Sequence, residues 1–223
     1  MKKVLLILVA TAFSFTAAMA DVMVTAGVSG NMSVFAAEGK ERNYDYAGTI
    51  AKTTIEYGAF KDYYSSIFAE VGNGTVGIGI SYVPTSIATP ENESEQVQIT
   101  NATSSTETVQ VDFNDLTTIY AIARLPVWGM YVKAGISQVD LAITETNASA
   151  NYSNTDTDGY TIGFGFEKEA GDTGLGIRLE IMGHEFDDVA SNNGKAVGVA
   201  DANVIDVSDL LGATATISIV KNF

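Results

Sequence analysis

The sequence predicts an all-β protein: a membrane-spanning, up-and-down antiparallel β-barrel of about eight strands, with short periplasmic turns and long extracellular loops. Three observations lead to this prediction. Apolar residues recur at every second position in several segments, and short and long connections alternate along the chain. The chain also ends on an aromatic residue, in the middle of the alternating stretch GATATISIVKNF. A soluble domain usually leaves its last residues frayed and polar, so this ending is unusual for a soluble protein.

The N-terminus has the three parts of a secretory signal peptide. A head with two lysines, an apolar run and the small-x-small triplet Ala18-Met19-Ala20 follow one another in residues 1–20. The alternative is an N-terminal anchor helix, but the run is shorter than the roughly 20 residues that such a helix needs, and polar residues interrupt it. We therefore expect cleavage after Ala20, with residues 21–223 as a single barrel domain.

The composition excludes several classes of protein. The chain carries 12 Lys and Arg against 27 Asp and Glu, and loss of two lysines with the signal peptide would change its net charge from −15 to −17. Nucleic-acid binding needs clustered basic residues, so no nucleic-acid partner is expected. The absence of cysteine excludes a disulfide scaffold and thiol chemistry. With 46% hydrophobic residues, the chain is too apolar to be disordered.

Period-two alternation defines the expected strands. Residues 160–167 and 175–182, for example, alternate large apolar residues with mostly small or charged ones. Such alternation is typical of a strand with one apolar and one polar face. The expected strands cover residues 22–36, 63–72, 75–83, 116–125, 129–143, 159–169, 174–186 and 207–223.

The connections between these strands are of two kinds. The turns at residues 72–74, 125–129 and 171–174 are short and rich in Gly or Pro. The other connections are long, polar and acidic, and they cover residues 37–62, 84–115, 144–158 and 187–206. Strict alternation of short and long connections is the wiring of a transmembrane barrel, and an even number of strands leaves both termini on the periplasmic side.

Period two alone does not distinguish a membrane barrel from a soluble barrel or sandwich, which turns its apolar face inward. Two features favour the membrane. The polar faces are dominated by Gly, Ser and Thr, which would make a poor soluble surface. Aromatic residues lie near strand ends, at Tyr82, Tyr160, Phe166 and Phe223, where the membrane interfaces would be. We therefore expect the apolar face to point outward into lipid.

The last strand carries the most specific signal. Phe223, Ile219 and Ile217 fall on one face, and this ending resembles the assembly signal of Gram-negative outer-membrane barrels. Lys221 departs from that pattern, since an apolar or aromatic residue is usual there, although its charge could snorkel into the headgroups. The mature chain as a whole resembles the small eight-stranded barrels of the OmpA, OmpX and opacity-protein superfamily. The resemblance implies a monomer in the outer membrane of a Gram-negative bacterium, with the lipid bilayer and the outer-membrane assembly machinery as partners.

Six charged residues fall on the inward-facing sides of the expected strands, all near short turns: Glu70, Arg124, Lys133, Glu167, Arg178 and Glu180. The interior of an eight-stranded barrel is only just wide enough to be filled by its own side chains. Because three acids meet three bases, we interpret the set as an ion-pair network that plugs the periplasmic half of the lumen. Similar networks in the resembling barrels favour the plug. Conduction, ligand binding and catalysis are the alternatives.

The sequence offers one histidine and one candidate metal loop. Some small outer-membrane barrels are lipid-modifying hydrolases with a His and a Ser on the lipid-facing surface, but His184 points inward by its parity and has no Ser nearby on its strand. Asn154, Asp156 and Asp158 before Gly159 match the opening of a Ca²⁺ loop. The bidentate Glu expected six residues after that glycine is absent, and a solvated turn is the alternative. No other cofactor is expected.

The long loops hold most of the undecided function. Residues 84–115 contain six acidic residues and no basic one, so they form either a hydrated, repulsive fringe or a surface for an extracellular partner. The sequence therefore indicates a non-enzymatic barrel that acts as an envelope structural or surface-interaction (adhesion or recognition) protein. The alternatives are a narrow channel for small solutes, a lipid-modifying hydrolase and a soluble secreted β-sandwich.

Overall fold

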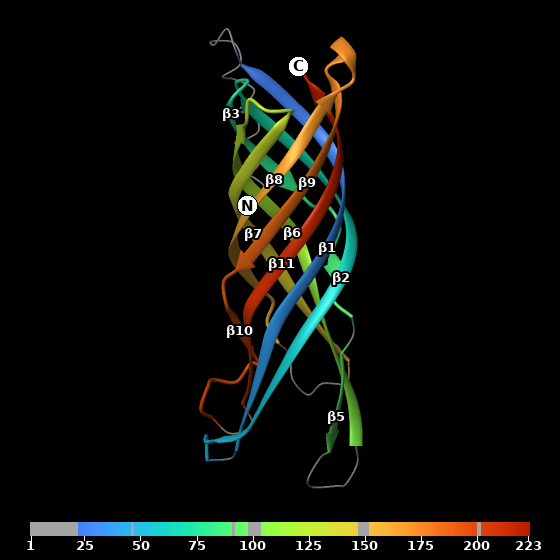
Figure 1. Ribbon diagram of the computed structural model, residues 1–223. Coiled ribbons are helices and arrows are strands. Elements are labelled where there is room, and N and C mark those ends of the chain that lie inside the picture. Colours follow the sequence, from blue (N-terminus) through green and yellow to red (C-terminus); the bar gives the residue numbers. More distant parts are fainter. Residues whose placement is uncertain (1–21, 46, 91, 98–103, 147–151, 200–201) are drawn as a thin grey trace.

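The computed structural model describes residues 22–223 apart from 46, 91, 98–103, 147–151 and 200–201, so the expected signal peptide lies outside the described residues. The main strands are β1 (Met23–Tyr44), β2 (Ile50–Gly72), β3 (Val76–Tyr82), β6 (Ser104–Arg124), β7 (Met130–Thr146), β8 (Thr155–Glu169), β9 (Leu175–Phe186) and β11 (Asn203–Asn222). Neighbours pair antiparallel in the order β1-β2-β3-β6-β7-β8-β9-β11, and β11 returns to β1. Within the described part of the chain, these strands close a ring of eight (Figure 1), which confirms the predicted fold class.

Three shorter strands add to this ring. Both β4 (Ile87–Ala88) and β5 (Asn92–Val97) pair with β6, and β10 (Val189–Asn192) pairs with β11. In Figure 1, β5 and β10 lie toward the end of the molecule opposite the C-terminus, which is the end of the long connections. No helix among the described residues is long and apolar enough to cross a membrane.

Several strands are longer than the sequence indicated. β1 and β2 stay paired as far as Asn43↔Lys52 and Tyr44↔Ile50, through nearly all of the expected loop 37–62. The boundaries predicted for this loop were therefore wrong. Residues here alternate charged side chains with Thr, Tyr and Ile, which favour strand pairing even where both faces of a hairpin meet water. The long connections thus project from the barrel largely as β-hairpins.

The short turn between β6 and β7 shows why glycine is needed at this end. Trp128 and Gly129 both have left-handed backbone conformations, with φ of 51° and 74°. A Cβ atom on Gly129 would lie 2.1 Å from the carbonyl oxygen of Glu167, so only glycine fits against β8. The tight turn brings β6 directly back as β7.

Large apolar side chains cover the outside of the barrel wall. Ile162 is 69% exposed, Ile219 62% and Ile177 57%. Exposed aromatic residues lie near both limits of this apolar belt, with Tyr63 and Tyr160 toward the long hairpins and Trp128 in a short turn. A water-soluble protein rarely exposes so large a continuous apolar surface. The apolar face therefore points outward, as predicted for a barrel in lipid.

Candidate functional site

The charged cluster near the short turns is centred on Glu70 of β2. Arg178 of β9 has no exposed side-chain surface, and its guanidinium donates two parallel hydrogen bonds to the Glu70 carboxylate. Nη1 lies 2.6 Å from Oε1, and Nη2 lies 3.0 Å from Oε2. The hydroxyl of Tyr120 on β6 also donates to Oε1, over 2.9 Å. A bidentate contact of this kind fixes both the position and the orientation of the two side chains.

Two further ion pairs extend this contact around the barrel wall. Nη2 of Arg124 lies 3.2 Å from Oε2 of Glu70, and Nη2 of Arg178 lies 2.7 Å from Oε2 of Glu167. Asn222, near the end of β11, donates to the other oxygen of Glu167 over 3.0 Å. The cluster therefore joins side chains from β2, β6, β8, β9 and β11.

The remaining pair of the predicted six lies beside this cluster. Nζ of Lys133 on β7 is 2.5 Å from Oε1 of Glu180 on β9, and both side chains are buried. The Lys133 ammonium also lies 4.1 Å from the centre of the Tyr120 ring, and the Arg178 guanidinium lies 4.9 Å from that of Phe68. Aromatic faces attract cations, so these rings add to the stabilisation of the buried positive charges. The structure thus brings all six predicted residues together with equal numbers of acids and bases.

A layer of hydroxyl and amide side chains follows along the inward face of β1. Ser29 Oγ lies 2.8 Å from Ser218 Oγ, and the Asn31 amide donates to Ser66 Oγ over 3.0 Å. One step further, Ser33 Oγ lies 2.6 Å from Thr214 Oγ1. These bonds join β1 to its two neighbours, β2 and β11. The middle of the lumen is therefore polar and internally hydrogen-bonded.

An apolar layer fills the lumen beyond the polar one, and the sequence analysis missed it. Phe35 is 2% exposed, and its ring centre lies 5.4 Å from that of Phe60 and 5.8 Å from that of Phe113. The other buried members are Val83, Ile87, Leu116, Val139, Leu141, Phe186 and Leu210. A signal was available, because Phe35 continues the inward parity of Ser29, Asn31 and Ser33.

A small cavity lies between the charged cluster and the apolar layer. Its volume is about 70 Å³, and mostly polar side chains line it, among them Ser66, Thr216, His184 and the Lys133–Glu180 pair. A cavity of this size and polarity has room for about two water molecules. The interior thus has three parts in series: a neutralised ionic cluster, a polar middle with a small chamber, and an apolar layer.

His184 lies where the polar and apolar parts meet. Its Nε2 is 2.9 Å from Thr214 Oγ1, a contact that the sequence analysis did not anticipate because it searched for a hydroxyl on the same strand. Pairing of β9 with β11 supplies the hydroxyl instead. Among the described residues, Nδ1 has no hydrogen-bond partner, so no carboxylate orients the ring as in a hydrolytic triad. The centre of the His184 ring lies 6.3 Å from that of the Phe35 ring. The side chain is therefore inside the barrel and away from lipid, which favours a structural role.

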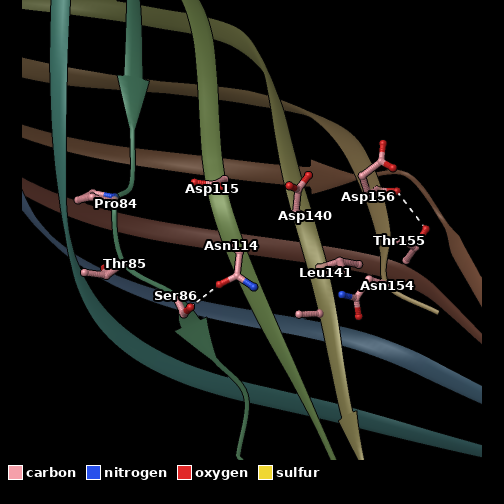
Figure 2. A pocket seen from close by; sticks show the side chains of 11 residues that line it. Pro84, Thr85, Ser86, Asn114, Asp115, Asp140, Leu141, Asn154, Thr155 and Asp156 are labelled. Atoms are coloured by element: carbon pink, nitrogen blue, oxygen red, sulfur yellow. Dashed lines mark hydrogen bonds between the residues drawn. The ribbon is translucent and has the colours of Figure 1, made fainter. Parts of the chain in front are cut away.

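The candidate calcium motif lies beside a surface pocket. Figure 2 shows this pocket, of about 570 Å³, with Asp115, Asp140 and Asp156 on its lining. Asp156 and Asp158 belong to β8 rather than to a loop, so they form an extended row on its outward face. Asn154 Oδ1 accepts a hydrogen bond from the amide of Ile143, over 3.2 Å. Among the described residues, no three His, Cys, Asp or Glu side chains are grouped so that they could hold a metal ion.

The C-terminal residues singled out in the sequence lie on the outside of β11. Ile217, Ile219 and Phe223 are 58%, 62% and 74% exposed, and the Phe223 amide donates to the Val24 carbonyl over 2.9 Å. Lys221 shares their side of the strand. Its ammonium donates to the carbonyl of Thr173 over 2.6 Å, so it contacts the short turn between β8 and β9.

Comparison with known proteins gives structural matches only. No protein-family model matches the chain, and no curated protein matches its sequence. The outer membrane protein OprG from Pseudomonas aeruginosa is similar with a TM-score of 0.54 at 8% identity, covering 92% of this chain and 96% of that one. Neisserial surface protein A gives 0.41 at 10% identity, with 86% and 97% covered, and Ail of Yersinia pestis gives 0.36 at 9%, with 87% and 99% covered. The first similarity extends over almost the whole of both chains. The chain therefore has the fold of an outer-membrane β-barrel.

Proposed function

We propose that the chain is a non-enzymatic protein of the Gram-negative outer membrane, closed to solutes, which acts at the cell surface through its projecting hairpins. The observation that carries this proposal is the filled lumen. The Glu70–Arg178 cluster occupies one end of the interior, and the layer around Phe35 occupies the other. A passing solute would have to displace both. Opening the ionic cluster alone exposes buried charges without partners, at about 3–5 kcal/mol.

The projecting hairpins supply the surface for such a role. Beyond the apolar belt, β1 and β2 remain paired as far as Tyr44↔Ile50, and Arg42 and Asp206 form an ion pair of 2.7 Å between β1 and β11. The projecting sheet is therefore held by backbone pairing and by side chains, and it presents an ordered face to the outside. Ordered loops that extend from a rigid scaffold are common sites of recognition.

Electrical recording tests the closed lumen. The purified protein, refolded into planar lipid bilayers, should give no steady conductance above that of the protein-free membrane. A combined variant, Glu70→Ala with Phe35→Ala, removes one member of each layer and serves as the positive control for opening. A steady conductance of the unmodified protein that changes in Glu180→Gln would overturn the proposal.

A narrow channel for small solutes is the second candidate, and one observation favours it. β3 ends at Tyr82, whereas its neighbours β2 and β6 continue beyond it. Past the last β2–β3 pair, Ile67↔Tyr82, the wall next to β2 is completed by the segment after Tyr82, in which Ile87 has no exposed surface. Side-chain packing rather than strand pairing closes the barrel at this point. Packing can open with less rearrangement than a hydrogen-bonded ladder.

Uptake of small apolar solutes into proteoliposomes tests this second candidate. If solutes pass at this site, proteoliposomes with the unmodified protein should take up solute faster than protein-free liposomes, and Ile87→Ala should accelerate this uptake. The matched control is Ile67→Ala, which shortens an exposed, outward side chain at the last β2–β3 pair. Equal uptake by proteoliposomes and protein-free liposomes would exclude the channel.

A further inference from the structure

The turn between β6 and β7 is apolar and exposed. Residues 125–130 read Leu-Pro-Val-Trp-Gly-Met, and Trp128 is 85% exposed. The three other large apolar side chains of this turn are exposed as well. The other two short turns, residues 72–74 and 171–174, read Gly-Asn-Gly and Gly-Asp-Thr-Gly, so they carry no large apolar side chain. Contiguous exposed apolar side chains of this kind mark a contact outside the chain.

The backbone of this turn is unfavourable for a tryptophan. Trp128 and the residue after it have φ of 51° and 74°, and the Met130 amide donates to the Val127 carbonyl over 3.0 Å. A turn with this hydrogen bond and two positive φ angles is of type I′, whose first central position favours Asn, Asp or Gly. The other two non-glycine residues with positive φ in the described part of the chain are aspartates, which tolerate this conformation better. Because such strain is retained where a residue has a function, the turn alone does not explain Trp128.

The turn is continuous with the lipid-facing belt. Met130 pairs with Phe166 of β8, and both side chains are exposed on the outer wall. No charged residue lies between Trp128 and the outward apolar residues of β7. In contrast, the exposed side chain of Lys168 separates the belt from the polar turn at residues 171–174. The β6–β7 turn is therefore the apolar extension of the belt at this end of the barrel.

The belt is short on this side of the barrel. On β7 the outward apolar positions run only from Met130 to Ile136, and Asp140 follows on the same face. Such a run covers about 20 Å along a strand, which a strand tilt of about 40° reduces to about 16 Å across the membrane. The apolar band of an outer-membrane barrel is about 25 Å tall. On β1, opposite β7 in the ring, the outward positions stay uncharged from Val24 to Ala36, over about 31 Å across the membrane. The β6–β7 turn thus lies where the belt is too short by about 9 Å.

We propose that the β6–β7 turn is a lipid anchor, inserted among the phospholipids of the inner leaflet of the outer membrane. Trp128 then lies at the boundary between headgroups and acyl chains, where its amphipathic ring is favoured. Continuity with the belt makes phospholipid, rather than a periplasmic protein, the occupant of this surface. The anchor increases the apolar height on the short side, and it removes a mismatch that would otherwise thin the bilayer or tilt the barrel. It depends neither on the closed lumen nor on a role of the projecting hairpins.

Fluorescence quenching locates the anchor, because Trp128 is the single tryptophan of the chain. The full mature protein is refolded into phosphatidylcholine vesicles whose acyl chains carry bromine either close to the headgroup or close to the chain end. We expect a large loss of emission with the first lipid and a smaller loss with the second. Iodide, present in the water on both sides of the membrane, should quench little.

The matched control moves the tryptophan to a polar turn at the same end of the barrel. Asp172 is exposed in the turn between β8 and β9, and Trp128→Tyr with Asp172→Trp places the only indole there. In this variant iodide should quench strongly and the brominated lipids weakly. Iodide quenching of the unmodified protein as strong as that of the control would show that the β6–β7 turn lies in water, open to a protein partner, and would contradict the anchor.

Replacement of Trp128 by asparagine distinguishes an anchor from an ordinary turn residue. Asparagine suits a type I′ turn, so Trp128→Asn should raise the urea midpoint of unfolding if only the turn matters. If the turn is an anchor, Trp128→Asn should lower this midpoint. The loss should be larger in bilayers of long-chain lipid than in thin bilayers of short-chain lipid, which match the short side of the belt without the turn. The migration of unboiled samples measures the folded fraction without the tryptophan.

Two further variants complete this test. Trp128→Phe keeps an apolar ring on the same strained backbone and should retain most of the midpoint in the thicker bilayer. Asp172→Asn changes a residue of the polar turn and should leave the midpoint unchanged in both lipids. A midpoint of Trp128→Asn equal to or above that of the unmodified protein in the thicker bilayer would overturn the inference.

Discussion

Glu70 and Arg178 meet inside the barrel although 108 positions separate them in the sequence, and their side chains form two parallel hydrogen bonds of 2.6 and 3.0 Å. The first comes from β2 and the second from β9, so the contact crosses the lumen rather than joining neighbouring strands. Both side chains are almost fully buried. Their pairing determines how the periplasmic half of the interior is filled.

Glu70→Gln should destabilise the barrel strongly. The substitution removes the negative charge that faces Arg178 and Arg124 while keeping the size of the side chain. An uncompensated buried charge lowers the free energy of unfolding by about 3–5 kcal/mol. Urea unfolding in lipid vesicles, followed by the fluorescence of the single tryptophan, measures this change. The exposed residue Asp209 provides the control, since Asp209→Asn should change the unfolding free energy by no more than about 0.5 kcal/mol.

Lys133 and Glu180 should be energetically coupled. The free energies of unfolding of Lys133→Met, Glu180→Gln and the double variant define a thermodynamic cycle. Because Nζ and Oε1 are 2.5 Å apart in a buried site, we expect a coupling energy of about 1–3 kcal/mol. Additive single effects would show that the contact contributes nothing, and that packing alone holds these side chains.

Phe35→Ala should destabilise the apolar layer without opening the lumen. Removal of a buried phenylalanine side chain costs about 3–5 kcal/mol, because a cavity remains where the ring contacted Phe60 and Phe113. The ionic cluster lies at the other end of the interior, so bilayer recordings of this single variant should show no conductance. A conducting single variant would mean that the apolar layer alone seals the barrel.

Ile162→Lys should destabilise the barrel because this side chain points into lipid. A lysine near the middle of the bilayer costs about 2–4 kcal/mol on an outer-membrane barrel. Ile55 is also exposed, at 50%, but it lies on the projecting part of β2. Ile55→Lys should therefore change the free energy of unfolding by less than about 0.5 kcal/mol. Similar effects at both positions would contradict the location of the membrane belt.

Phe223→Ala should reduce delivery to the outer membrane more than it reduces stability. Phe223 is 74% exposed at the end of the last strand, so the loss of its ring removes little packing. If the terminal residues are read by the assembly machinery, the folded fraction in isolated outer membranes should fall, while the protein refolded in vitro keeps its unfolding midpoint. Leu211→Ala, an exposed apolar substitution further along the same strand, is the matched control.

Strand parity allowed the ionic cluster of the interior to be predicted from the sequence. Residues such as Arg178 and Glu180 stand two positions apart among outward apolar residues, and a strand necessarily places them on the same inner face. The eight-stranded ring followed from counting such segments. Their partners across the lumen could be matched by charge, because a narrow barrel leaves few other places for a buried acid or base.

Other features depend on contacts that the pattern does not show. Asp115 has a left-handed backbone with φ of 53°, at a register shift in the β6–β7 pairing. This irregularity changes the alternation and turns Phe113 inward, so a parity count along β6 would place this member of the apolar layer on the wrong face. The hairpin extensions were hidden for another reason. Polar residues around Lys52 look like a loop, and only the matching stretch of β1 shows that they are paired.

Closure of the ring between β1 and β11 has a consequence for biogenesis. Thr25 pairs with Asn222, so the seam joins the first strand made to the last one made. Contacts of such long sequence separation form late, and a nascent chain that lacks its final strand exposes two unpaired edges to its neighbours. Escort proteins in the periplasm would therefore have to shield the unfinished barrel until β11 has arrived.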